Sequence, residues 1–309
     1  MWFILAIVAL LCWSGSDIFS KIGSKQDDKN SQWKMVIAVG LVMGLHAAFE
    51  IFVRGVDFTF GAMVQYLPAS LLYIGSMVLG YISLRYIELS VSSPICNSSG
   101  AVAALICFLL YKIAPSIVPG YEVPEWPVWL GVSVVAAGVI ALGVVEYRED
   151  QSSRDLRQEK ALRKYQKSFL ALLLPILYCL IDAAGTAADY SILQGMDEDV
   201  ANVAYELTFL LMGIIAAIYV FGIRREKPSF PSDGHKLLGG VCETAGQLAY
   251  IYAIGNEAHA TSSMAIISAY CAVSAIWGRV FLKEKLSIKH YISIAIALVG
   301  IVLLGVFDA

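Results

Sequence analysis

The sequence predicts an all-α polytopic membrane protein, and three observations support this fold class: composition, the length of the apolar stretches and the distribution of charge. Of the 309 residues, 58% are hydrophobic and only 15% are charged, with a mean hydropathy of +0.70. An average soluble domain does not reach these values. Crossing a hydrocarbon layer of about 30 Å takes roughly 20 helical residues, and apolar stretches of that length recur ten times. Runs such as 132–145 are apolar on every face, unlike the alternating strands of an outer-membrane barrel.

Ten transmembrane helices are expected, in two groups of five. The first five spans cover about residues 2–24, 32–54, 63–88, 91–112 and 126–147, and the second five cover about residues 168–194, 198–223, 236–258, 260–282 and 288–307. Each half has an odd number of spans, so the second half enters the membrane from the opposite side, which predicts two inverted five-helix repeats. The chain thus divides into a first repeat at 1–147, a charged linker at 148–167 and a second repeat at 168–309.

Positive charge marks one face of the predicted bundle. All Lys and Arg residues except Arg54 and Lys112 lie near alternate connections, beginning with the one after the first span. The positive-inside rule places these connections in the cytoplasm and both termini outside it. Residues 1–11 carry no basic stretch and precede no cleavage site of small residues, so the first span is expected to be retained. We therefore expect a multi-pass protein of the bacterial plasma membrane with extracytoplasmic termini.

The linker at 148–167 is predicted to be helical at about 156–165 and to lie along the cytoplasmic lipid surface. Its basic residues are mixed with Glu149, Asp150, Asp155 and Glu159, which dilute the positive field. A solvated tether is therefore the simpler interpretation. A binding site for anionic lipid or for a partner protein is the alternative.

Neither the cysteines nor any sequence motif indicates catalysis. The six cysteines lie one per segment, without a CxxC or Cys/His spacing, so we expect packing residues rather than disulfides or metal ligands. The chain lacks a GxSxG elbow, a Walker loop, an HExxH motif and a GxGxxG turn. We therefore expect no enzyme activity, no ATP coupling, no cofactor, no metal and no nucleic-acid partner.

Two short segments suggest that the halves arose by duplication. Residues 83–94, between the third and fourth spans, match residues 253–264, between the eighth and ninth, as tight reversals rich in small residues. Asp17 in the first span and Asp182 in the sixth also occupy comparable positions. This weak similarity falls where a duplication predicts it.

Four segments resemble the drug/metabolite transporter superfamily, in particular its EamA-type branch. They are residues 13–15 (WSG), the hairpin at 84–93, the run 281–287 (FLKEKLS) and the run 300–304 (GIVLL). The resemblance spans nearly the whole chain, and 281–287 is its most specific part. It implies ten helices in two inverted repeats, alternating access, and a central cavity lined mainly by spans one, three, four, six, eight and nine. Many relatives keep both termini in the cytoplasm, and the charge pattern of this chain departs from that.

Ionisable residues inside spans are the first candidates for function, because a carboxylate at mid-bilayer costs at least roughly 2.5 to 3.5 kcal/mol. Asp182 lies near the middle of the sixth span, with Thr186 one turn later and Asp189 two turns later. All three share one helix face, and such a row suits a cation or a proton. The alternative is an Asp182 side chain that is hydrogen-bonded to Ser or Tyr hydroxyls within the bundle.

Two further polar pairs each have two interpretations. Glu243 and Gln247 form a stripe on the eighth span, which either contacts the substrate or leaves Glu243 in an ion pair with Arg279. Asp17 and Lys21 lie four residues apart in the first span, and they either neutralise each other or contact the substrate.

A third group lies toward the outer side. His46 and Glu50 on the second span, with Glu206 on the seventh, form a candidate proton relay, because an imidazole titrates near neutral pH. A histidine that simply snorkels to the interface is the alternative.

Aromatic residues are expected to shape the cavity. Their rings could stack on a flat metabolite or hold an ammonium group by cation–π attraction. Helix packing and interface belts account for most membrane aromatics, which is the alternative for each of them. Asn97 adds a neutral hydrogen-bonding group early in the fourth span. The aromatic candidates are Trp13, Tyr81, Tyr178, Tyr250 and Tyr270.

Together these features predict a secondary transporter, not driven by ATP, that moves a small polar metabolite such as an amino acid or an amine by alternating access. Proton coupling is a further hypothesis. The expected partners are the substrate and the lipid bilayer, for a monomer or a homodimer. A lipid-linked-sugar flippase is one alternative. A membrane scaffold or sensor that recruits a partner through residues 148–167 is the other.

Overall fold

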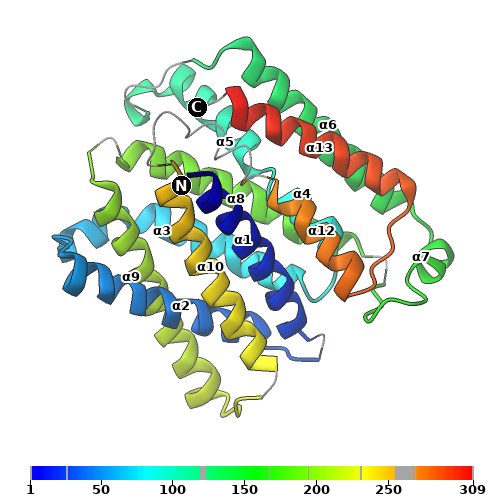
Figure 1. The fold of residues 1–309 in the computed structure, drawn as a ribbon, viewed down its shortest axis with the longest axis horizontal. Helices are drawn as coiled ribbons and strands as arrows, with labels where there is room; N and C mark the ends of the chain where they lie inside the picture. The colour runs from blue at the N-terminus through cyan, green and yellow to red at the C-terminus, as the bar shows by residue number, and fades with distance from the viewer. Residues whose placement is uncertain are drawn as a thin grey trace.

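The computed structural model is all-helical in the part of the chain that it describes (Figure 1). That part comprises residues 2–25, 27–118, 123–166, 168–193, 195–229, 232–254, 267 and 269–307. Within these ranges no strand occurs, which confirms the all-α fold class.

The helices follow the predicted spans closely. In the first half they are α1 (Trp2–Gly23), α2 (Ser31–Phe49) with the π-helical turn η1 (Glu50–Arg54), α3 (Phe60–Ser83), α4 (Leu89–Cys96), α5 (Ser99–Ile113), the 3-10 turn η2 (Pro115–Ile117) and α6 (Trp126–Arg148). The linker contains α7 (Gln151–Arg157). In the second half they are α8 (Phe169–Leu193), α9 (Glu198–Ala217) with the π-helical turn η3 (Ile218–Ile223), α10 (Ser232–Ile254), α12 (Tyr270–Phe281) and α13 (Ile288–Phe307).

Seven helical segments in the described ranges are long and apolar enough to cross a membrane. They are Trp2–Gly23, Ser31–Arg54, Phe60–Ser83, Leu89–Ile113, Trp126–Arg148, Phe169–Leu193 and Glu198–Ile223. A shorter apolar segment covers Ile288–Leu303. Helix α10 has 23 residues but is less apolar, because Asp233, Lys236 and Glu243 interrupt it.

The fourth predicted span is broken in the middle. Helix α4 ends at Cys96 and α5 begins at Ser99. Pro94 lies in the last turn of α4, and its carbonyl accepts a hydrogen bond from the Ser98 hydroxyl at 2.7 Å. This interruption presents Asn97 and Ser99 side by side, and both line the cavity described below.

Helices from the two halves alternate in space (Figure 1). Helix α1 packs along α10, α3 along α8, α2 along α9, and α6 along α13. The glycines of the second span allow one of these contacts. A Cβ on Gly40 would lie 2.5 Å from the carbonyl oxygen of Phe209, so α2 and α9 approach this closely only because Gly40 has no side chain.

The linker is not the solvated tether that the sequence suggested. Arg154, Arg157, Gln158 and Tyr165 are at most 9% exposed. That expectation was wrong because buried basic side chains of the linker have acidic partners within the chain. Glu149, for example, pairs with Arg157 at 2.8 Å.

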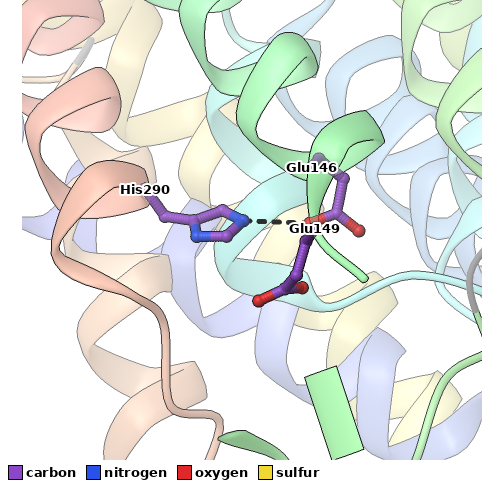
Figure 2. Close-up of side chains that lie close together, drawn as sticks. All are labelled: Glu146, Glu149 and His290. Carbon is purple, nitrogen blue, oxygen red and sulfur yellow. Dashed lines mark hydrogen bonds and ion pairs between the residues drawn. The ribbon is translucent and has the colours of Figure 1, made fainter. Parts of the chain in front are cut away.

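A junction of charged groups fixes the linker to the ends of α6 and α13. Figure 2 shows Glu146, Glu149 and His290 facing one another, with the Nε2 atom of His290 3.0 Å from a Glu146 carboxylate oxygen. Arg154 also pairs with Glu146 at 2.5 Å, and both carboxylates therefore already face guanidinium groups. This donor set suits ion pairing within the protein better than coordination of a metal ion.

Candidate functional site

A cavity of about 710 Å³ lies between the two halves of the chain. Its walls come mainly from α1, α3, α4, α5, α8, α10 and α12, which agrees with the spans that the family resemblance implied. Helix α9 also contributes, through Asn202 and Tyr205. Most of the predicted site residues meet here: Trp13, Asp17, Tyr81, Asn97, Tyr178, Asp182, Thr186, Asp189, Glu243, Gln247, Tyr250 and Tyr270.

Two buried carboxylates of the cavity are held by serine hydroxyls from neighbouring helices. One oxygen of Asp17 accepts hydrogen bonds from Ser93 on α4 at 2.6 Å and from Ser274 on α12 at 2.7 Å. Asp182 accepts from Ser76 on α3 at 3.0 Å. Hydroxyl donors orient a carboxylate without neutralising its charge, so both groups remain able to attract a cation or a proton.

Glu243 completes an inner acidic set, which we define as Asp17, Asp182 and Glu243. Its carboxylate accepts a hydrogen bond from Ser16 on α1 and interacts electrostatically with the other two members. Arg279 forms no ion pair with Glu243 in the described part of the chain. The ion-pair interpretation of Glu243 is therefore wrong.

The polar row on α8 lies as predicted, on one face of the helix. Asp189 accepts hydrogen bonds from the hydroxyls of Tyr66 at 2.6 Å and Tyr73 at 3.4 Å. Tyr73 also donates to Thr186 at 3.4 Å. With Glu198 and Asp199 at the start of α9, Asp189 forms an outer acidic set along the same cavity.

Aromatic rings cover much of the remaining wall. The Trp13 ring lies 5.3 Å from the ring of Tyr250 and 5.8 Å from that of Tyr270, measured between centroids. Gly246 makes room for it, because a Cβ there would come within 2.5 Å of the indole. The sequence predictions missed Tyr66, Tyr73 and Tyr205. The spacing of Tyr66 and Tyr73, two turns apart on the third span, could have indicated a shared face.

Lys21 does not pair with Asp17, which corrects that interpretation of the first span. Its ammonium group donates to the carbonyl oxygens of Leu84, at 2.6 Å, and Ile87, and it lies 4.5 Å from the centre of the Tyr165 ring. Lys21 thereby ties the end of α1 to the hairpin between α3 and α4. Asp17 is left facing the cavity.

Lys21 belongs to a larger charged network at the end of the molecule where the basic connections meet. We call this end the basic end, and it comprises the connections around residues 24–30, 84–88, 149–168, 224–231 and 282–287. Arg157 in the linker pairs with Glu88 at 2.6 Å and donates to the carbonyl of Lys285 at 2.9 Å. Burial raises the pKa of the Glu88 carboxyl although Arg157 opposes this shift.

The most specific motif of the sequence acts within this network. Glu284 accepts hydrogen bonds from the backbone N–H groups of Leu89 and Ser90, each at 3.1 Å, and from the Ser90 hydroxyl at 2.8 Å. A carboxylate at a helix N-terminus satisfies free donors and complements the helix dipole. Glu284 therefore anchors α4, the helix that supplies Ser93 to Asp17.

The cavity runs from the basic end toward the opposite end. Near the basic end its described lining ends at Ser20, Leu84 and Leu89. In the other direction it reaches Glu198 and Asp199, in the first turn of α9. Within the described residues, the contacts of Lys21 and Arg157 thus lie at the basic end of the cavity.

The predicted relay residues also meet, beside the cavity. His46 Nδ1 lies 2.8 Å from Glu206, and Nε2 lies 3.3 Å from Glu50, which pairs with Arg54 at 2.9 Å. Glu50 and Glu206 are nearly inaccessible to solvent, so the snorkelling interpretation of His46 is wrong. Asn202 hydrogen-bonds Glu206 and also lines the cavity, and it connects the two sites.

Comparison with known proteins agrees with the family that the sequence resembles. Residues 170–306 match the model of the EamA-like transporter family. The match runs from α8 to α13 and confirms the resemblance to the EamA-type branch of the drug/metabolite transporter superfamily. No curated protein sequence matches the chain.

Proposed function

We propose that this chain, a membrane protein whose second half belongs to the EamA-like transporter family, is a secondary transporter that moves a small polar metabolite by alternating access. The observation that carries this proposal is the cavity between the halves, whose buried Asp17 and Asp182 are held, within the part of the chain that the structure describes, by hydroxyl groups. Burying such groups is costly. A binding role for the cavity accounts for that cost, whereas a purely structural role does not.

Several features support two inverted five-helix repeats. In two repeats, α1, α2 and α3 correspond to α8, α9 and α10. The contact of α1 with α10 then has a counterpart in the contact of α8 with α3, and both contacts occur. The contact of α2 with α10 likewise becomes that of α9 with α3, and both occur. The echo between 83–94 and 253–264 cannot be compared, because most of the second segment lies outside the described residues.

The ends of α2 and α9 give a second argument for the repeats. Each helix ends in a π-helical turn, η1 or η3. Each turn is followed by a residue with positive φ, Gly55 at 76° and Arg225 at 54°. Each is closed by a backbone hydrogen bond spanning six residues, from Val56 to Glu50 and from Glu226 to Val220. A π-helical ending is uncommon, so two unrelated helices are not expected to share it.

We assign the basic end to the cytoplasm, as the positive-inside rule predicts. In this orientation the charged network lies on the cytoplasmic side of the cavity and serves as its cytoplasmic gate. For the opposite state, contacts such as Lys21 with the hairpin carbonyls and Arg157 with Glu88 must break.

Proton coupling is supported by the acidic cavity and by the group of His46, Glu50 and Glu206. A carboxylate can exchange its proton for a substrate when both compete for one site. An imidazole exchanges protons readily, and His46 connects to the cavity through Glu206 and Asn202.

Transport by the purified protein in liposomes tests the proposal. We expect substrate flux that requires no ATP, responds to an imposed pH gradient and is lost in Asp182→Asn. The exposed Asp155→Asn variant is the matched control and should keep wild-type flux. Flux that is indifferent to the gradient would contradict proton coupling. Flux that is unchanged in Asp182→Asn would contradict the role of the cavity.

The two alternative functions have less support. A flippase for lipid-linked sugars needs basic groups for a phosphate, but the cavity residues that the structure describes include no Lys or Arg. A scaffold could recruit partners through exposed linker side chains such as Leu156, but Arg154, Arg157 and Gln158 of the linker are buried in contacts within the chain.

A further inference from the structure

We infer that the substrate of this cavity is an organic cation without a carboxylate, that is, an amine or a quaternary ammonium compound rather than an amino acid. This inference rests on the proposed transport function and specifies its substrate class. It follows from three properties of the described lining: its charge, the partners of its carboxylates and its aromatic surface.

The lining is acidic throughout. It contains the inner set, the outer set and, among the residues that the structure describes, no Lys, Arg or His. A substrate carboxylate would need a cationic partner in such a site and would instead meet the field of several acids. An ammonium group meets a complementary charge at every depth of the cavity. The lining therefore selects against anions and zwitterions as well as in favour of cations.

The hydrogen-bond partners of the inner carboxylates leave the negative charge of these groups unneutralised, so a cationic ligand can neutralise it. Among the described residues, the hydrogen-bond donors to Asp17 and Asp182 are neutral hydroxyls, at 2.6 to 3.0 Å. Lys21, the nearest basic residue in sequence to Asp17, is engaged by the carbonyls of the α3–α4 hairpin. Lys21 and Arg157 are thus engaged by backbone carbonyls and by Glu88 rather than by the inner carboxylates.

The aromatic surface suits the body of an organic cation. Trp13, Tyr250 and Tyr270 form one aromatic cluster, with centroid separations of 5.3 and 5.8 Å from the Trp13 ring. Ring faces attract ammonium and quaternary ammonium groups, and Trp does so most strongly. The Trp13 indole lies on α1, one turn from Asp17, so a ring face and a carboxylate share the same region of the cavity.

The outer set gives the cation a route inward. Asp189 and Glu198 lie along the cavity away from the basic end, as does Asp199, which the Arg54 guanidinium approaches to 3.9 Å. Seven residues separate Asp189 from Asp182 on α8, a rise of about 10 Å. Charges of one sign along a cleft concentrate the opposite ion and raise its rate of entry.

Three probes of the same shape and different charge test this inference: phenethylamine, phenylalanine and phenylacetate. Binding to the purified protein at neutral pH is followed by tryptophan fluorescence and by the shift in thermal unfolding midpoint. We expect phenethylamine to bind on the order of tenfold more tightly than either other probe. Equal or tighter binding of phenylalanine or phenylacetate would overturn the inference.

Variants and a permanent cation provide independent readouts. Asp17→Asn and Glu243→Gln should weaken phenethylamine binding, whereas the exposed control Asp155→Asn should not. If an inner-set variant fails to fold, the inference is still tested on the wild-type protein with benzyltrimethylammonium. This permanent cation cannot donate a hydrogen bond. It should compete with phenethylamine, and Trp13→Leu should weaken its binding. No competition in the wild-type protein would contradict a site built on charge and ring faces.

A transport measurement separates this inference from the proposed function. Counterflow of phenethylamine but not of phenylalanine in proteoliposomes would support both. Counterflow of phenylalanine alone would overturn the substrate class and leave the transporter in place. Tight binding of phenethylamine without counterflow of any probe would leave the cation site standing and contradict transport.

Discussion

Glu284 illustrates how a side chain in a connection can shape a cavity that it does not line. It caps the N-terminus of α4 through Leu89 and Ser90, and α4 carries Ser93 against Asp17. The sequence marks this residue only as part of a family-like motif. Its physical role is to hold a short helix, broken after Cys96, in position beside the site.

Replacing Glu284 with Ala should lower the free energy of unfolding by about 0.5 to 2 kcal/mol, the usual cost of losing a helix cap. It removes the acceptor for two backbone N–H groups and one hydroxyl. Thermal unfolding in detergent measures the change. The neighbouring Lys285→Ala, which removes an exposed side chain, should leave the midpoint unchanged. Equal effects of the two variants would contradict the capping role.

Two carboxyls of the basic end should make stability depend on acid pH. Burial acts to raise the pKa of Asp28, but Lys236 and Lys34 outweigh it and hold this pKa below its usual value. A hydrogen bond from Lys34 lowers the pKa of Glu226. A carboxyl with a lowered folded-state pKa stabilises the fold above its unfolded pKa, and the contribution disappears as the pH falls through the folded pKa.

The expected result is a thermal midpoint that drops as the pH falls below about 4, near the unfolded carboxyl values. The double variant Asp28→Asn, Glu226→Gln should unfold at a lower temperature at neutral pH and show a flatter acid limb. Asp27→Asn, at an exposed neighbouring position, serves as control and should keep the wild-type profile. If the midpoint of the double variant still falls as steeply at acid pH, other groups cause the pH dependence and its assignment to Asp28 and Glu226 is wrong.

At the scale of elements, the helix pairs depend on small residues at their crossings. Gly40 brings α2 against the backbone of α9. Gly40→Ala should therefore destabilise the protein by about 1 to 3 kcal/mol, the usual cost of overpacking. Gly143→Ala is the matched control, because a Cβ on Gly143 of α6 would meet nothing within 4 Å. Thermal unfolding should separate the two variants, and equal midpoints would exclude the close contact as a source of stability.

Periodicity and hydropathy predicted the elements well where the information is local. The ends of α1, α2 and α8 fall within a few residues of the predicted spans, because a bilayer imposes the same length on each of them. The polar face of α8 was also predictable, since Asp182, Thr186 and Asp189 follow the helical repeat.

The partners of charged residues were not predictable, because they lie far apart in sequence. Arg157 meets Glu88 across 69 residues, and Lys21 meets the carbonyl of Leu84 across 63. Local composition therefore suggested a solvated linker and an internal pair between Asp17 and Lys21. In the folded chain, tertiary packing instead buries part of the linker and directs Lys21 to backbone carbonyls. His46 and Glu206, which are 160 residues apart, were grouped correctly only because both were expected near the same side of the bundle.

At the scale of the whole molecule, the linker crosses the basic end and holds several helix connections together. Through Arg157 it joins the α3–α4 hairpin to the α12–α13 connection, and through Arg163 it reaches the carbonyls of Ile22 and Ser24 at the end of α1. Opening this end requires these contacts to part together. The linker therefore belongs to the gate of the proposed transporter.

Arg157→Gln should shift the protein toward opening at the basic end. The native Cys96 lines the cavity, so its labelling by a membrane-impermeant maleimide added from that side should increase severalfold. The label is read at each cysteine by mass spectrometry. Lys160→Gln, in the same linker but exposed, should label like wild type. If Arg157→Gln keeps its thermal midpoint and the labelling of Cys96 does not change, the role of the linker in closing the basic end is contradicted.

The pairing of α1 with α10 also constrains how the chain is made. Helix α1 is synthesised long before α10, which begins at Ser232, and Ser16 and Ser20 of α1 are covered by α10. Until α10 has been made, α1 must therefore stand in lipid with these hydroxyl groups incompletely shielded. Membrane insertion of α1 and its final packing are two separate events, and the second cannot finish before α10 has been synthesised.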